Sequence, residues 1–181
     1  MSKKTMGFGG EIGSIVQMAY VVKDIHEAID WWIRKAGVGP WFFLPSFGGE
    51  GHVFRGQPCT SDVAIAMSFA GPLNIELLMP LDDNPSVYKE TIDRVGYGFH
   101  HFGIARDDIE EEVERRLAKG EVLAHRAPVP TGGKVAYFEG GVGAPGFVEL
   151  IPATPGMDEG FTNFWRQTQN WDGKDPIRPF G

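Results

Sequence analysis

The sequence contains a single cysteine, Cys59, and no long hydrophobic run. One cysteine cannot form a disulfide within the chain, which indicates a reducing compartment. The charged N-terminus is not followed by an apolar stretch, so it lacks the pattern of a signal peptide, and no window approaches the length of a membrane span. We therefore expect a cytoplasmic protein with no membrane partner.

Positive charge is also scarce. The 17 lysines and arginines are outnumbered by 24 aspartates and glutamates, which gives a formal net charge of −7. Because there is no basic run or basic helix face, we expect no nucleic-acid partner. The composition, 42% hydrophobic and 23% charged over 181 residues, is that of a globular protein with enough chain to bury a core.

What the sequence does contain is an internal repeat. Two strand-like runs are each followed by an Asp-Ile pair, and aligning these pairs places Gln17 over His101. Later in each half, two apolar runs match so that Glu76 falls over Glu149. Each copy of the repeat therefore contains one Gln or His and one Glu at matching positions. This recurrence suggests a four-ligand metal site shared between the two halves.

Each strand of the first pair leads into a helix with an apolar stripe. The spacing of apolar residues predicts a helix over residues 26–36, with Asp24 in a capping box and Gly37 as the stop. Asp108 and Gly120 bracket a second, more polar helix in the same way. Three strand-like runs follow each helix, at residues 39–47, 63–69 and 73–80 in the first half and 121–127, 134–139 and 147–152 in the second.

Each half therefore has the pattern βαβββ. We predict an α+β protein in which two tandem βαβββ modules form a partly closed mixed β-barrel with the helices outside. The expected modules are residues 12–81 and 97–155, joined by a linker with a helix at 82–96. Residues 156–181 form a C-terminal extension whose aromatic residues suggest a short helix and an arm lying on an apolar surface.

Strand periodicity supports the shared site. Alternate side chains of a strand share a face, so Gln17 and His101 stand among small neighbours that leave room for an ion and a substrate. Glu76 and Glu149 lie in runs that otherwise look fully buried, where an isolated carboxylate is costly and needs a charged partner.

Taken singly, these residues have simpler interpretations. A histidine in an apolar strand is more often a core residue, a strand glutamate usually faces solvent, and a strand glutamine indicates nothing. The recurrence in two copies favours the shared site. His52 and His125 lie in or near loops, where a role as proton shuttles is one interpretation, and surface histidines without a role are the simpler account of both.

These residues resemble the vicinal-oxygen-chelate superfamily, which includes glyoxalase I, methylmalonyl-CoA epimerase, extradiol dioxygenases and antibiotic-resistance binding proteins. The resemblance covers about residues 12–153. It rests on Gln17 with Val22-x-Asp24, on Ala28-Ile29-Asp30-Trp31-Trp32 followed by Gly37-Val38-Gly39-Pro40-Trp41, on Ile75-Glu76-Leu77, on His100-His101-Phe102-Gly103 and on Gly146-Phe147-Val148-Glu149-Leu150.

The resemblance implies that Gln17, Glu76, His101 and Glu149 are metal ligands, a set similar to that of some glyoxalase I enzymes. Such oxygen and nitrogen donors suit a divalent metal ion: Zn, Ni, Co or Mn. Family chemistry chelates two oxygens of a small-molecule substrate and stabilises the enolate that forms when a proton beside a carbonyl is removed. Glu149 is the expected catalytic base and Glu76 the second candidate. Family members often dimerise, so we expect a homodimer.

We therefore expect a glyoxalase-like, metal-dependent isomerase or lyase that acts on a small apolar or aromatic substrate. A methylmalonyl-CoA epimerase-like racemase is an alternative, although few basic residues lie near the expected mouth to bind CoA phosphates. A non-enzymatic protein that sequesters a ligand is another. An extradiol dioxygenase would need a His, His, Glu triad, which Gln17 would break.

Overall fold

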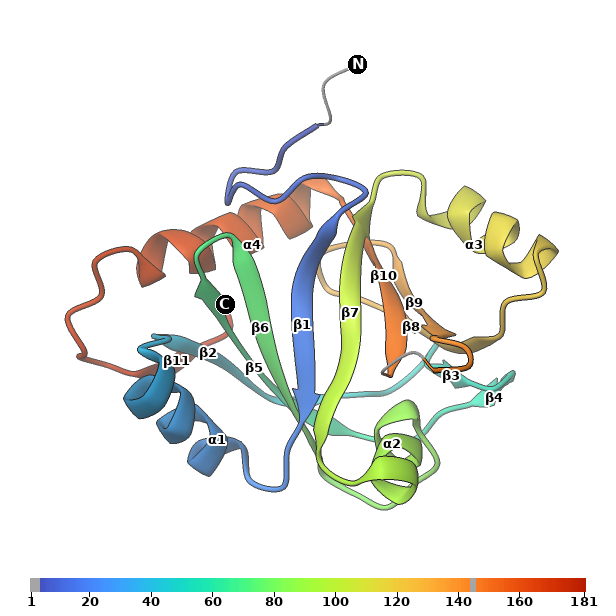
Figure 1. Ribbon diagram of the computed structural model, residues 1–181, viewed down its shortest axis with the longest axis horizontal. Helices are drawn as coiled ribbons and strands as arrows, with labels where there is room; N and C mark the ends of the chain where they lie inside the picture. Colours follow the sequence, from blue (N-terminus) through green and yellow to red (C-terminus); the bar gives the residue numbers. More distant parts are fainter. Residues whose placement is uncertain (1–3, 144–145) are drawn as a thin grey trace.

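The computed structural model describes residues 4–143 and 146–181, and its centre is one curved sheet (Figure 1). Eleven strands follow the order β11-β2-β5-β6-β1-β7-β10-β9-β8-β3-β4. The strands are β1 Ile15–Val21, β2 Trp41–Phe47, β3 Val53–Phe54, β4 Gln57–Pro58, β5 Val63–Ala70, β6 Leu73–Pro80, β7 Gly98–Arg106, β8 Leu123–Pro128, β9 Lys134–Glu139, β10 Phe147–Pro152 and β11 Ile177–Pro179. The helices are α1 Ile25–Trp31 with its π-helical continuation η1 Trp32–Ala36, α2 Val87–Val95, α3 Ile109–Ala118 and α4 Pro155–Thr168.

The repeat is visible in the strand order. The strands β2-β5-β6-β1 of the first half are mirrored by β8-β9-β10-β7 of the second, and the halves join where β1 and β7 pair antiparallel. Within each half the first and last strands are parallel, β1 with β6 and β7 with β10. Figure 1 shows β1 and β7 side by side in the middle of the sheet. The predicted α+β fold class, two βαβββ units around a partly closed sheet, is confirmed.

Helices α1 and α3 cover the outer face of their own halves. Ile25 and Ile29 of α1 pack in a cluster with Trp41 and Leu77, because residues four apart lie on one side of a helix. The helix starts as expected, since the Asp24 carboxylate accepts hydrogen bonds from two backbone N–H groups at 2.9 and 3.0 Å.

The prediction that the Asp108 side chain caps the start of α3 is wrong. The Asp108 side chain accepts no hydrogen bond from the backbone of the helix. It is bound instead by the guanidinium groups of Arg106 and Arg115, at 2.8 and 2.6 Å, which lower the pKa of Asp108 to about 2. Two charged donors are stronger partners for a carboxylate than neutral N–H groups.

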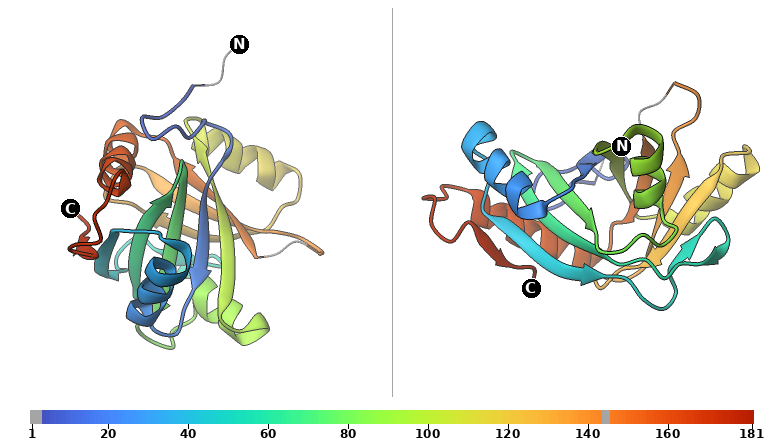
Figure 2. Two further views of the ribbon diagram at one scale, coloured as in Figure 1. Left: turned by 60° about the vertical axis from the view of Figure 1, so that its left-hand side comes forward. Right: turned by 90° about the horizontal axis from the view of Figure 1, so that it is seen from below.

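The segment between β2 and β5 contains a hairpin, β3–β4, that the sequence did not predict. It crosses to the far edge of the second half, where β3 pairs with β8 (Figure 2, right). At its turn, Arg55 binds Glu90 of α2 through two 2.8 Å hydrogen bonds and Glu139 of β9 through one of 2.6 Å. The hairpin therefore connects the two halves on the side opposite the β1–β7 seam.

The C-terminal extension is part of the core. Helix α4 packs against the face of the sheet that α1 does not cover, where the rings of Phe164 and Phe42 stack with centroids 4.1 Å apart. Beyond it, β11 adds to the β2 edge, and the Trp171 ring lies so close to Gly39 that a Cβ there would be 2.5 Å away. Among the described residues, no helix is long and apolar enough to cross a membrane.

We predict that Phe164→Ala lowers the free energy of unfolding by about 3–5 kcal/mol, because it leaves a cavity at the stacked ring pair. Urea unfolding followed by fluorescence measures this. Val95→Ala, at a side chain that is 74% exposed, is the control and changes stability by less than about 0.5 kcal/mol. Equal, small effects of both changes would mean that α4 is not an integral part of the core.

Candidate metal centre

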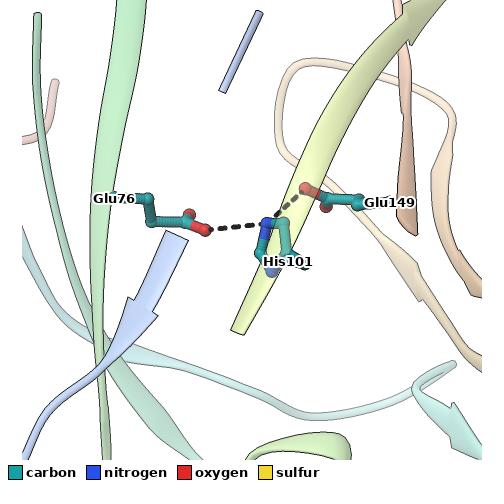
Figure 3. Close-up of side chains that lie close together, drawn as sticks. All are labelled: Glu76, His101 and Glu149. Carbon is teal, nitrogen blue, oxygen red and sulfur yellow. Dashed lines mark ion pairs between the residues drawn. The ribbon is translucent and has the colours of Figure 1, made fainter. Parts of the chain in front are cut away.

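The structure brings all four predicted ligands together. Gln17, Glu76, His101 and Glu149 stand on β1, β6, β7 and β10, the four adjacent strands at the centre of the sheet, and each is at most 5% exposed. His101 Nε2 lies 2.9 Å from Glu149 Oε2, 3.1 Å from Gln17 Oε1 and 3.5 Å from Glu76 Oε2. Figure 3 shows the two carboxylates approaching His101 from opposite sides.

The strand register produces this convergence. Gly103, two residues after His101 and on the same face of β7, is paired with Gln17 on one side and Glu149 on the other. A Cβ on Gly103 would lie 2.8 Å from Gln17 Oε1 and 2.6 Å from a methyl carbon of Ile151. Glycine at this position therefore provides the space in which the neighbouring ligand side chains meet.

His101 is oriented by a chain of hydrogen bonds that ends at a backbone carbonyl. His100 Nε2 lies 3.2 Å from Val87 O, and His100 Nδ1 lies 2.8 Å from His101 Nδ1. Because a carbonyl only accepts, His100 Nε2 carries a proton, and burial lowers the pKa of His100 well below its usual value, which keeps the ring neutral. His101 Nδ1 then donates to His100, and the lone pair of a neutral His101 is on Nε2. That is the tautomer a metal ligand needs.

Gln17 is oriented in a similar way. Asn74 Nδ2 donates to Ser68 O at 3.2 Å, which leaves Asn74 Oδ1 to accept from Gln17 Nε2 at 3.0 Å. The Gln17 amide is thereby turned so that Oε1 faces His101 Nε2. A fixed acceptor orientation of this kind is characteristic of outer-shell support at metal sites.

The described part of the protein provides no arginine or lysine to balance the charges of the Glu76 and Glu149 carboxylates. Within residues 4–143 and 146–181, no lysine or arginine forms an ion pair with Glu76 or Glu149, and Glu76 Oε2 is buried without a hydrogen-bond partner. Burial, together with the charge of Glu149, raises the pKa of Glu76 well above its ordinary value. Three acceptor oxygens thus surround His101 Nε2, an arrangement that requires a cation or a proton among them.

A divalent ion fits this donor set. Glu76, His101 and Glu149 offer ligand atoms that all lie within 4.8 Å of one another, and Gln17 adds an amide oxygen next to them. Oxygen and imidazole nitrogen donors, with no thiolate, suit Zn, Ni, Co or Mn.

A narrow cavity of about 100 Å³ adjoins the four residues. Gln17, Glu76 and Glu149 form part of its wall, and most other lining side chains are apolar, including Phe180 of the C-terminal extension. Its remaining polar groups are the hydroxyls of Tyr88, Tyr137 and Thr131 and the imidazole of His125.

Sequence reasoning missed several of these groups. Tyr137 is paired with Glu149 across the β9–β10 ladder, and its hydroxyl forms a hydrogen bond with that carboxylate. Tyr137 follows Val135 at strand spacing, a pattern that places it on the inner face, but an aromatic strand residue also fits an ordinary core.

The expectation that His52 and His125 are surface histidines was wrong. They are only 7% and 3% exposed, and their ring centroids lie 5.9 Å apart. The reason is the pairing of the hairpin β3–β4 with β8, which covers both rings. No local pattern in the sequence indicates this long-range contact.

Comparison with known proteins agrees with the geometry. A profile described as the Glyoxalase/Bleomycin resistance protein/Dioxygenase superfamily matches residues 16–138, more than half of the chain. The chain belongs to this superfamily. A search of curated proteins found no match.

Solved structures share the fold of this glyoxalase-superfamily chain at low sequence identity. A hypothetical protein from Bacillus halodurans has a TM-score of 0.59 and 21% identity, over 78% of this chain and 94% of that one. Methylmalonyl-CoA epimerase from Mycobacterium tuberculosis has a TM-score of 0.59 and 17% identity, over 88% and 97%. A variant of the Streptomyces coelicolor methylmalonyl-CoA epimerase, in complex with 2-nitronate-propionyl-CoA, has a TM-score of 0.60 and 15% identity, over 80% and 97%. At such identities these similarities show the fold alone.

We predict that, in the metal-free protein, the contribution of Glu76 to stability falls as the pH rises above 4.5, the ordinary pKa of its carboxyl group. Its folded-state pKa is raised above the ordinary 4.5, so the folded state holds this proton more tightly than the unfolded state. The resulting stabilisation is complete below the unfolded pKa and is lost as the pH rises through the folded pKa. Glu76→Gln, which is neutral at every pH, should therefore gain stability over the unmodified chain as the pH rises.

Urea unfolding in the presence of a chelator, at pH 5 and pH 8, measures this difference. Glu159→Gln, at an exposed position of α4, is the matched control and should show a constant difference. A constant difference for Glu76→Gln as well would contradict the prediction.

We also predict that His100→Phe lowers metal affinity by roughly 10–100-fold, the usual effect of losing an outer-shell partner. His100→Gln should restore part of the affinity, because an amide can both donate to Val87 O and accept from His101. Titration against a competing chelator measures the affinity, and His52→Phe, a change at a buried histidine outside this chain of hydrogen bonds, is the control. Unchanged affinity in His100→Phe would show that His100 does not orient the ligand.

Proposed function

We propose that the protein is a divalent-metal-dependent isomerase or lyase of the glyoxalase type, which removes a proton beside a carbonyl group of a small substrate. The observation that carries the proposal is the pair of buried carboxylates, Glu76 and Glu149, facing one imidazole and one amide oxygen with no arginine or lysine ion pair among the described residues. The metal ligands would be Gln17, Glu76, His101 and Glu149. A bound ion would act as a Lewis acid that stabilises the negative charge developing on the substrate carbonyl oxygen.

In this proposal the carboxylates also move the proton. Glu149 is the catalytic base, since it lines the cavity and its carboxylate accepts a hydrogen bond from Tyr137. Glu76 is the second candidate: it lines the same cavity, and its unpartnered oxygen and raised pKa fit a group that takes up a proton. The apolar walls limit access of water, which strengthens the electrostatic interactions inside.

The cavity restricts the substrate. At about 100 Å³ it is smaller than the engineered cavities of about 150 Å³ that hold a benzene molecule, so the reacting part of the substrate is a compact group. Its apolar lining fits a neutral, partly apolar molecule with two adjacent oxygens.

Two alternatives give different experimental outcomes. A racemase like methylmalonyl-CoA epimerase, the activity named for two of the similar structures, would exchange the α-proton of an acyl-CoA thioester whose CoA part lies outside the cavity. A protein that only sequesters an apolar ligand would not need two hydrogen-bonded chains that orient Gln17 and His101. Cytoplasmic location and homodimer formation stay predictions.

We predict that the purified protein binds about one Zn, Ni, Co or Mn ion per chain and that, once loaded, it exchanges a carbon-bound proton of hydroxyacetone with deuterium from the solvent. Elemental analysis and proton NMR measure the two properties. Glu149→Gln should lower the exchange rate at least 100-fold, within the range expected for a general base. A native protein that is metal-free and fully active would refute the proposal.

The same assay distinguishes the alternatives. Exchange of methylmalonyl-CoA but not of hydroxyacetone would identify a racemase, and metal binding without exchange of any carbonyl compound would indicate a binding protein. Glu159→Gln, at an exposed residue that is not among those lining the cavity, serves as the control for a change of charge.

A further inference from the structure

One buried polar atom in the cavity wall has no role in the proposed metal centre. Among the described residues, His125 Nδ1 is buried without a hydrogen-bond partner. The residue is 3% exposed, and its ring forms part of the wall of the cavity that Glu76 and Glu149 also line. A buried polar group without a partner costs about 1–3 kcal/mol, so its presence calls for an explanation.

The protonation state of His125 can be deduced from its surroundings. The ring forms a hydrogen bond with the backbone of Val53, on the crossing hairpin. Since Nδ1 has no partner, the nitrogen that donates to this carbonyl is Nε2. Burial, with a smaller contribution from His52, lowers the pKa of His125 to about 4, so the ring is neutral near pH 7. His125 Nδ1 therefore presents a lone pair, which can only accept a hydrogen bond.

The position of His125 relates it to the metal centre. The Tyr137 ring contacts both His101 and His125, with centroid distances of 4.9 and 5.5 Å. His125 is thus one aromatic ring away from the ligand His101.

We propose that His125 is a specificity-determining residue that accepts a hydrogen bond from a hydroxyl group of the substrate, beyond the two oxygens that the metal would chelate. The proposal rests on the metal-dependent function above and narrows its substrate class to compact, neutral hydroxycarbonyl compounds with an additional hydroxyl group. A substrate without that hydroxyl leaves the buried acceptor unpaired, which is the basis of the selectivity.

The test compares two probes that differ by one hydroxyl group, hydroxyacetone and dihydroxyacetone. Both are small, neutral and able to chelate through adjacent oxygens. Their dissociation constants are measured by NMR titration of the metal-loaded protein. We expect the unmodified protein to prefer dihydroxyacetone by about fivefold or more, the value of one neutral hydrogen bond.

Three variants assign the preference to His125. His125→Phe should bind both probes equally, within twofold, and His125→Gln, which keeps an acceptor, should recover part of the preference. His52→Phe, at the neighbouring buried histidine that is not among the residues lining the cavity, should keep the full preference. Metal content is measured in the unmodified protein and in every variant, since an unmodified protein that binds no metal would be a failure of the proposed function and not of the role of His125.

Each result of these binding measurements either supports or overturns the role of His125. The proposal is supported when His125→Phe loses the preference with normal metal content and normal affinity for hydroxyacetone. It is overturned when the unmodified protein shows no preference, when His125→Phe keeps it, or when His52→Phe loses it to the same extent. A uniform loss of affinity for both probes in His125→Phe would also overturn it, because that result indicates only a change of cavity shape.

Discussion

The two carboxylates of Glu76 and Glu149, buried on either side of His101, are the constraint on which the rest of the site depends. Two buried negative charges cannot both persist near one neutral imidazole in a medium of low dielectric constant. Either a proton is held within this group of three residues or a cation lies between the carboxylates. The raised pKa of Glu76 describes the first state, and the ligand atoms within 4.8 Å of one another fit the second. Under the proposed function a metal ion would displace protons from this site, so metal affinity would depend on pH.

The polar partners of Gln17 and His101 turn an acceptor atom of each residue toward the centre of the site. Each of the two uncharged ligand residues is oriented by a chain that ends at a backbone carbonyl, His101 through His100 and Gln17 through Asn74. A backbone carbonyl cannot donate, so it fixes the direction of every hydrogen bond in the chain and leaves an acceptor at the centre. Gln17 and His101 thus occupy equivalent positions in the two halves of the fold. The residues that orient them differ, because Asn74 is the partner of Gln17 and His100 is the partner of His101.

The sequence predicted the repeated part of the protein because that part is encoded in local periodicity. The α+β fold class, the strands β6, β9 and β10 to the residue and the convergence of the four inward side chains follow from patterns of two and 3.6 residues. The parts that it did not predict depend on contacts between distant segments. The two-residue strands of the hairpin are too short to show a period, and the burial of His52 and His125 results from the pairing of β3 with β8. The local sequence also predicted that Asp108 caps helix α3, but its carboxylate binds Arg106 and Arg115 instead.

The repeated strands and the segments outside the repeat contribute different parts of the candidate site. The repeated strands carry the four candidate ligands, whereas the segments outside the repeat shape the cavity beside them. Helix α4 contributes Met157 and Phe161 to its wall, Phe180 lines it directly after the end of β11, and the hairpin contacts His125 through Val53. Superfamily members that share the metal-supporting strands can therefore differ in substrate without changing the ligands, because the groups that meet the far end of the substrate belong to other segments. Under the proposed function, substrate selectivity would depend on the hairpin and the C-terminal extension, whereas the reaction would take place at the β1–β7 seam.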